Sequence, residues 1–190
     1  MKTVNALYHQ TASAIDEELE WIEASKTDPK QFGPLYRKYY TDIFRYIWKR
    51  VGEEELAATL VSNVFVKALQ SIHKYTYRGV PFSAWLYQIA RNEINLFHRA
   101  NQRSRTVTME TYQLKEVVSE MNEDDNEENL QLLLNGLEHL QPEELELLEM
   151  RYFEKRSFKE VSEILQIKEG TAKVKMHRII QKLKDLILNV

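Results

Sequence analysis

Apolar residues recur every three or four positions along most of the chain, the spacing that places side chains on one face of an α-helix. Breaks in this pattern coincide with residues that end helices, including the pair Asp28-Pro29 and Gly52. We therefore expect an all-α protein. The pattern predicts helices within residues 1–28, 32–51, 53–69 and 82–99, two helices between 129 and 150, and two more between 157 and 188.

The last two predicted helices follow each other closely. Ser157 stands where the first of them needs a cap, and Glu160 three residues later completes a capping box. Gln166 and Ile167 then leave room only for a turn before a second helix starts near Glu169. The buried face of that helix is expected to comprise Ala172, Met176, Ile179, Ile180, Leu183 and Ile187. Two helices joined by so short a turn predict a helix-turn-helix.

The outer face of the second helix is cationic. Between Arg151 and Asp185 there are ten Lys or Arg against five acids, in a chain whose net charge is −3. The second helix of a helix-turn-helix enters the major groove, and nearby cations neutralise phosphates. A merely solvated charged face is the plain alternative, but the tight spacing of the two helices favours DNA binding. The candidate DNA-binding residues are Thr171, Lys173, Lys175, Arg178 and Lys182.

The string RYFEKRSFKEVSEILQIKEGTAKVKMHR, residues 151–178, resembles the C-terminal helix-turn-helix of bacterial RNA polymerase sigma factors, in particular the small extracytoplasmic-function class. The resemblance implies that this motif reads the minus thirty-five promoter element. Members of that family usually have a small residue, often Gly, where this chain has Gln166. A left-handed backbone in this turn would cost a non-Gly residue about 1 kcal/mol or more.

A second aromatic and basic segment surrounds the start of the helix predicted over 82–99. Tyr75, Tyr77 and Arg78 precede two helix breakers and are therefore expected on a loop. Aromatic rings beside cations bind unpaired bases by stacking, so opened DNA would fit this loop. A structural role is equally open for the two tyrosines. Trp85 lies inside an apolar repeat and is expected in the core.

The string PFSAWLYQIARN, residues 81–92, is similar to the sigma factor signature at this place. In that family the segment recognises and melts the minus-ten promoter element. The resemblance implies that the loop holds a flipped base and that polar residues of the following helix face DNA. The residues implied are Tyr75, Tyr77, Arg78, Arg91, Asn92, Asn95, Arg99 and Arg103.

The predicted helix pair over 32–51 and 53–69 resembles the part of sigma factors that grips the clamp helices of the polymerase largest subunit. The family commonly shows an Asp and then a Gln-Glu pair where this chain has Thr59 and then Ser62-Asn63. The resemblance therefore implies a polymerase-binding surface in which electrostatics contribute less. Its residues would be Thr59, Ser62, Asn63 and Val66.

The charge inverts between Thr106 and Met150, where thirteen acids face one base. Low hydrophobicity and one sign of charge predict a flexible tether over 106–128. The resemblance implies that it threads polymerase along a path later taken by RNA; a solvated spacer is the plain alternative. We expect an N-terminal extension (1–28) that either packs or regulates, a sigma domain 2-like bundle (29–105), the acidic flexible linker (106–128) and a sigma domain 4-like helix-turn-helix domain (129–190).

Several classes of protein are disfavoured by what the sequence lacks. The 190 residues include no Cys, no signal-peptide pattern and no run of 18 apolar residues, so we expect a cytoplasmic protein without membrane insertion. No phosphate-binding loop, metal motif or nucleophile motif occurs, and the five His are isolated. We therefore expect no catalytic activity and no metal or cofactor.

The expected function is that of a sigma factor, which binds core RNA polymerase and directs promoter recognition and DNA melting in transcription initiation. The resemblance also implies an anti-sigma factor as a partner. A stand-alone helix-turn-helix regulator, using only residues 151–186, is one alternative. A sigma-like interaction protein that binds polymerase without starting transcription is another, suggested by Thr59, Ser62 and Asn63.

Overall fold

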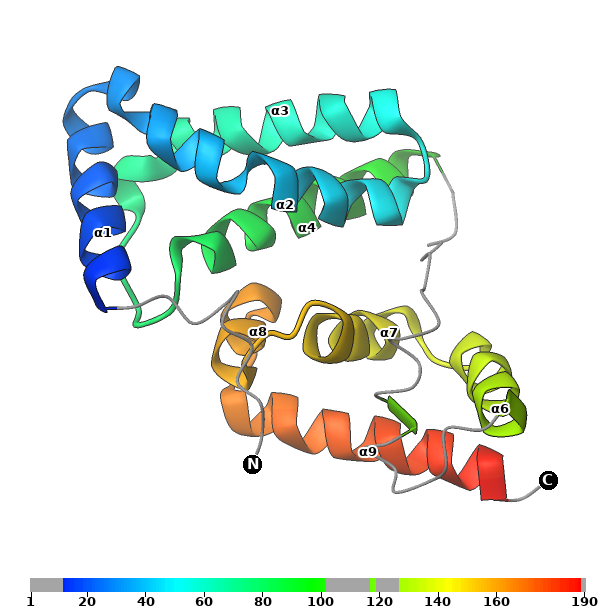
Figure 1. The fold of residues 1–190 in the computed structure, drawn as a ribbon. Helices are drawn as coiled ribbons and strands as arrows, with labels where there is room; N and C mark the ends of the chain where they lie inside the picture. The colour runs from blue at the N-terminus through cyan, green and yellow to red at the C-terminus, as the bar shows by residue number, and fades with distance from the viewer. Residues whose placement is uncertain (1–11, 102–116, 119–126, 189–190) are drawn as a thin grey trace. The chain divides into compact units, whose positions relative to one another are not determined.

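The computed structural model describes residues 12–101, 117–118 and 127–188 (Figure 1). All regular structure in these ranges is helical, and they contain no β-strand. The described residues form two compact units, with helices α1 to α4 in the first and α6 to α9 in the second. The prediction of an all-α fold with two small helical domains is confirmed. Among the described helices, none combines the length and apolar character needed to cross a bilayer.

The first unit is a bundle of three long helices with a fourth across one end (Figure 1). Helices α2, α3 and α4 contact one another, and α1 contacts α2 and the two short 3-10 helices η1 and η2. The apolar face predicted for α2 is buried, including Leu35, Ile43 and Ile47. The elements are α1 (Ala12–Thr27), η1 (Pro29–Phe32), α2 (Gly33–Val51), α3 (Glu54–Ser71), η2 (Ile72–Lys74) and α4 (Phe82–Asn101).

The helix ends in this unit follow from local chemistry. The side chain of Asp28 accepts a hydrogen bond from the backbone N–H of Lys30, so α1 stops and η1 begins there. Gly52 has a φ of 74°, a left-handed conformation that Gly adopts without a Cβ clash, and its N–H bonds the Trp48 carbonyl. Both ends lie where the sequence predicted them.

The second unit is built around its last helix. Helices α6, α7 and α8 all contact α9, whose buried face includes Ala172, Met176, Ile179 and Leu183 as predicted. The elements are α6 (Glu127–Glu138), α7 (Pro142–Leu148), a turn of π-helix η3 (Glu149–Phe153), α8 (Phe158–Leu165) and α9 (Glu169–Leu188). Part of the predicted tether, Val117 and Val118, is helical and fully buried. Nearly all of the remaining tether lies outside the described residues.

The turn between α8 and α9 lies where the sequence predicted it. Ser157 caps α8 with a capping box, because its hydroxyl accepts the Glu160 N–H while the Glu160 carboxylate accepts the Ser157 N–H. Gln166 ends α8 with φ 56° and ψ 43°, a left-handed conformation in a non-Gly residue. The Ile167 N–H then bonds the Ser162 carbonyl at 3.0 Å, which closes the turn as a Schellman motif.

Replacing Gln166 by Gly is expected to raise the free energy of unfolding by about 0.5 to 1 kcal/mol, because the left-handed conformation strains a residue with a Cβ. Urea unfolding followed by circular dichroism measures the change. Gln166→Ala is the matched control, since it shortens the exposed side chain but keeps the Cβ. A Gly variant no more stable than the Ala variant would contradict the expectation.

Candidate nucleic-acid interface

The exposed face of α9 carries the predicted DNA-binding residues. Thr171, Lys175 and Arg178 are exposed and lie at positions i, i+4 and i+7, so their side chains share one side of the helix. Lys173 is exposed as well, and its ammonium group pairs with Glu169 at 2.6 Å within the first turns. The opposite side of α9 is fixed in the core of the unit. The result is a rigid helix that presents cations and a hydroxyl to solvent.

Lys182 continues the spacing of this face at position i+11, but its ammonium group is engaged by other parts of the same unit. Its Nζ donates to the His139 carbonyl at 3.0 Å and to the Glu144 carboxylate at 3.1 Å, so it holds α9 against the start of α7. Burial acts to raise the pKa of Glu144. The Gln141 backbone N–H and Lys182 outweigh this effect, so the pKa of Glu144 lies below its ordinary value. Lys182 is therefore engaged inside the unit.

Replacing Lys182 by Met is expected to lower the free energy of unfolding by no more than about 1 kcal/mol, because the pair with Glu144 is partly exposed. The same change should leave the salt dependence of promoter binding as it is. Lys175→Met is the matched comparison, and it should reduce that salt slope by about one. Binding measured over a series of salt concentrations decides, and equal slopes for both variants would contradict the placement of Lys182.

A buried ion-pair network holds the start of α8. The guanidinium group of Arg156, which is 1% exposed, lies 2.9 Å from the Glu154 carboxylate and 3.5 Å from that of Glu160. Arg151 donates to the Arg156 carbonyl at 3.0 Å and lies 5.0 Å from the centre of the Phe158 ring. Arg156 therefore adds nothing to the basic surface that the sequence suggested; it fixes the first helix of the motif instead.

Val174 is a residue of this face that the sequence reasoning missed. It is 53% exposed and lies between Thr171 and Arg178 along the outer side of α9. The signal was present in the sequence, because position 174 falls outside the apolar repeat formed by Ala172 and Met176. The outer face of α9 is thus basic with one apolar side chain within it.

The loop between η2 and α4 presents one tyrosine and buries the other. The Tyr77 side chain is 44% exposed, and Arg78 beside it is exposed as well. Tyr75 is 8% exposed, and its ring lies 5.0 Å from that of Phe82 and 5.2 Å from that of Trp85. The expectation that the loop presents Tyr75 is therefore wrong, because an aromatic cluster takes its ring into the core. Trp85 belongs to that cluster but is half-buried, so it lies at the edge of the core and not fully inside it as predicted.

The polar residues predicted on α4 lie along a common side of the helix. Arg91, Asn95 and Arg99 are spaced by four residues, and Asn92 is their neighbour. Asn92 and Arg99 are exposed, whereas Arg91 and Asn95 are half-buried. Arg103, the last member of the predicted set, lies outside the described residues. The described members of the set therefore lie along one stretch of α4, which follows the Tyr77 loop in the sequence.

The residues predicted to bind polymerase share one face of α3. Thr59, Ser62, Asn63 and Val66 are all exposed and lie at positions i, i+3, i+4 and i+7. The Thr59 hydroxyl donates to the Glu55 carbonyl and the Ser62 hydroxyl to the Ala58 carbonyl, so both protons are directed at the helix backbone. None of the four side chains carries a formal charge, and the apolar one among them is Val66, which is 53% exposed.

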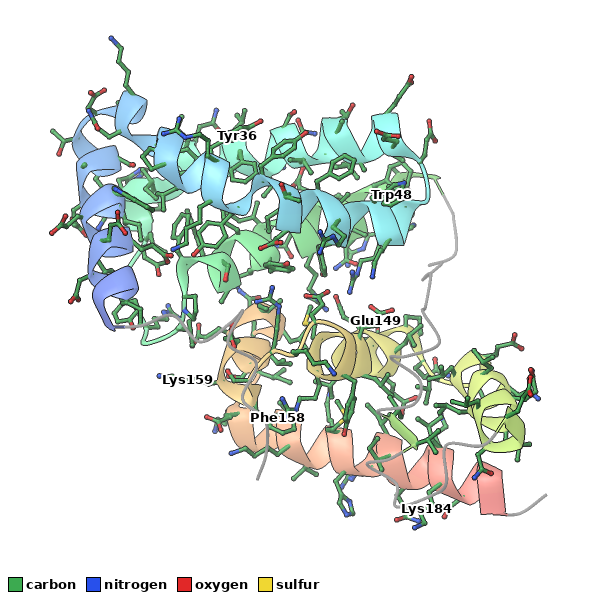
Figure 2. The ribbon with its side chains drawn as sticks, viewed as in Figure 1. Tyr36, Trp48, Glu149, Phe158, Lys159 and Lys184 are labelled. Atoms are coloured by element: carbon green, nitrogen blue, oxygen red, sulfur yellow. The ribbon has the colours of Figure 1, made fainter. Side chains whose placement is uncertain are left out.

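An aromatic row on α2 was not identified as a surface from the sequence. Tyr36, Tyr40, Phe44 and Trp48 follow one another every four residues, with successive ring centres 5.2 to 6.5 Å apart. Tyr36 and Trp48, labelled in Figure 2, are exposed, and the two rings between them are half-buried. Phe65 of α3 lies against Tyr36 and Tyr40. Periodicity alone had suggested only one apolar face on this helix.

Metal ligands are not gathered anywhere in the parts of the chain that the structure describes. No group of three His, Asp or Glu side chains there comes together as a metal site requires. The arrangement of the described residues is suited instead to contacts with a polyanion and with another protein. It combines a basic helix face, a loop with an exposed ring and a cation, and a polar face on α3.

Comparison with known proteins gives the same division of the chain. The family model for sigma-70 region 2 matches residues 35–104, and the model for sigma-70 region 4 matches residues 136–185. The ECF RNA polymerase sigma factor BldN of Streptomyces coelicolor is 33% identical over 174 residues, which cover 90% of this chain and 65% of the length of BldN. The ECF RNA polymerase sigma factor SigM of Bacillus subtilis is 26% identical over 152 residues, covering 80% of this chain and 92% of SigM.

Solved structures agree at the level of the fold. The sigma factor RpoE from Bartonella quintana, in complex with the anti-sigma factor NepR, superposes with a TM-score of 0.53 at 19% sequence identity. That match covers 85% of this chain and 98% of the RpoE chain. Both sigma-70 regions are present in their family order, and curated relatives of the ECF class align across most of the chain. The chain therefore belongs to the ECF class of the sigma-70 family of RNA polymerase sigma factors.

Proposed function

We propose that this protein binds core RNA polymerase, directs it to promoters and stabilises the opened DNA at the start of transcription. The observation that carries the proposal is that one chain holds a helix-turn-helix with an exposed basic face and a separate unit with an exposed Tyr-Arg loop. Paired DNA needs a helix for its major groove, and unpaired bases need a ring on which to stack. The two surfaces together match the two tasks of a sigma factor.

In this proposal the second unit reads the minus thirty-five element. Arg178 and Lys175 lie on the outer face of α9 and would contact base edges and phosphates in the major groove. Thr171 lies one turn closer to the start of the helix, where side chains of a recognition helix reach the bases. Lys173 would contribute to the positive potential after release from Glu169.

The first unit would hold the minus-ten element once it opens. Tyr77 offers an exposed ring for a flipped base, and Arg78 next to it offers a cation for the backbone. The residues of α4 that would continue this surface are Arg91, Asn92, Asn95 and Arg99, with Arg103 beyond the described range. Tyr75 supports the loop from within the core instead of contacting DNA.

The exposed face of α3 with Thr59, Ser62, Asn63 and Val66 would contact core polymerase. Because its four side chains are uncharged, binding should depend on shape and apolar contact, and it should be less sensitive to salt than promoter binding. We also propose that an anti-sigma factor regulates the protein, as the RpoE complex with NepR illustrates for another sigma factor. The protein would act in the cytoplasm as a regulatory and non-catalytic subunit.

The proposed domain limits are 29–105 for the polymerase-binding and minus-ten unit, 106–128 for the acidic linker and 129–190 for the minus thirty-five unit. The family matches over 35–104 and 136–185 support these limits. Helix α1 (Ala12–Thr27) would belong to the first unit, because it packs there and buries Ile22.

Reconstituted transcription tests the proposal. The purified protein is added to bacterial core polymerase, binding is measured by pull-down, and run-off transcription is measured on a promoter library. We expect both binding and promoter-dependent RNA. Binding to polymerase without RNA from any template would instead indicate a non-initiating interaction protein, which the uncharged α3 face makes the main rival. Tight promoter binding by the protein alone, without polymerase binding, would indicate a stand-alone regulator.

A further inference from the structure

Glu18 of α1 is a buried carboxylate that joins three helices. Its Oε1 accepts the backbone N–H of Phe82, the first residue of α4, at 2.7 Å. Its Oε2 accepts from Lys38 Nζ at 2.7 Å and from the Tyr39 hydroxyl, both on α2. Glu18 is only 3% exposed, so these contacts form away from bulk water. A buried carboxylate is tolerated when it is paired and hydrogen-bonded in this way.

The contact with Phe82 supplies what α4 lacks. The first N–H groups of an α-helix have no partner within the helix, and a Ser, Thr, Asp or Asn at the cap position usually accepts one of them. Pro81 precedes α4 and has no side-chain acceptor. Glu18, which is 64 residues away in sequence, provides the acceptor, and its charge also suits the positive end of the helix.

The same helix reaches the other end of the loop. Helix α1 contacts η2, which ends at Lys74 directly before the loop. Inside the loop, the Tyr75 ring is fixed against Phe82. Both ends of the loop are therefore tied to α1, while Tyr77 and Arg78 between them are exposed. A shift of the first turn of α4 would move the exposed part of the loop.

We propose that Glu18 is a positioning residue for promoter opening: by capping α4 it sets where Tyr77 and Arg78 meet the unpaired strand. The inference rests on the proposed function, because capture of a base by this loop is part of that function. It makes α1 a component of the minus-ten unit, although residues 1–28 lie outside the part that the region 2 family model matches.

The test replaces Glu18 by Gln. The amide can still offer oxygen to the Phe82 N–H, but its NH2 group then faces the donor of Lys38, so the cap is weakened. We expect binding to core polymerase and closed-complex formation to stay at the wild-type level. Open complexes, measured by permanganate reactivity of minus-ten thymines, should fall about tenfold, because the hydrogen bond from the Phe82 N–H no longer ends on a charged acceptor and is weaker. The amide proton of Phe82 should also exchange faster.

Tyr39→Phe is the matched control. It removes a hydroxyl donor from the same carboxylate but leaves the contact between Glu18 and Phe82, so it should lower stability without reducing open complexes or Phe82 protection. Equal bubbles in Glu18→Gln and wild type would overturn the proposal. So would equal losses in both variants, since Glu18 would then be an ordinary stabilising residue.

Failure of the proposed function would show separately, as the absence of any bubble with the wild-type protein. The exchange rate of the Phe82 amide, measured on the whole protein, decides the role of Glu18 even then. Faster exchange in Glu18→Gln but not in Tyr39→Phe would support the cap. Equal protection in Glu18→Gln and wild type would overturn it.

Discussion

Lys175→Glu combined with Arg178→Glu is expected to lower the affinity of the holoenzyme for promoter DNA at least about 100-fold, because two attractive contacts with the DNA become repulsive. Both side chains are exposed on the outer face of α9, away from its buried side. The fold should therefore be unaffected, and affinity for core polymerase should be unchanged because α3 lies in the other unit.

Fluorescence anisotropy of labelled promoter DNA measures the loss, and pull-down with core polymerase checks the second binding activity. Lys26→Glu combined with Lys30→Glu is the charge-matched control, because it changes the net charge equally at the end of α1 and at η1. The control should bind promoter DNA within a few-fold of wild type. Promoter affinity that is the same in both double variants would mean that net charge, and not the α9 face, governs binding.

Tyr77→Ala is expected to leave closed complexes intact and to reduce open complexes roughly tenfold, since stacking of one base on an aromatic ring is worth about 1 to 3 kcal/mol. The Tyr77 side chain is exposed, whereas the described ring contacts of this loop are made by Tyr75. Permanganate footprinting of the minus-ten thymines measures the open fraction.

Tyr75 supplies the controls for this experiment. Tyr75→Phe keeps the ring against Phe82 and Trp85 and should open promoters as wild type does. Tyr75→Ala should instead lower the free energy of unfolding by about 3 kcal/mol or more, because it leaves a cavity in the cluster. An unchanged bubble in Tyr77→Ala would remove this ring from the proposed mechanism.

The sequence was sufficient for features that depend on neighbouring residues. The cap at Ser157, the left-handed turn at Gln166 and the end of α2 at Gly52 each follow from residues within about one helical turn. Helical periodicity likewise identified the buried side of α9, and hence which residues face solvent. Much of the second unit could therefore be predicted without coordinates.

What the sequence could not reveal depends on contacts between distant segments. Lys182 was placed with the DNA face because it has the right spacing, but its partner Glu144 lies 38 residues earlier. Tyr75 is on a loop as predicted, but its ring is buried because it packs against Trp85 on the next helix. Glu18 had no predicted role, since nothing near it in the sequence reveals the Phe82 N–H. Periodicity shows which residues share a face of one helix, but it does not show which residues of other segments contact that face.

The ion pairs around Arg156 imply that salt can weaken promoter binding without unfolding the second unit, two effects that many substitutions would produce together. Contacts with DNA phosphates weaken steeply as the salt concentration rises, because less free energy is gained when DNA releases its bound counterions. Ion pairs that are shielded from solvent are screened far less. Arg156, Glu154 and Glu160 belong to the shielded kind. Salt concentrations that release the protein from its promoter should therefore leave the second unit folded, and lowering the salt again should restore binding.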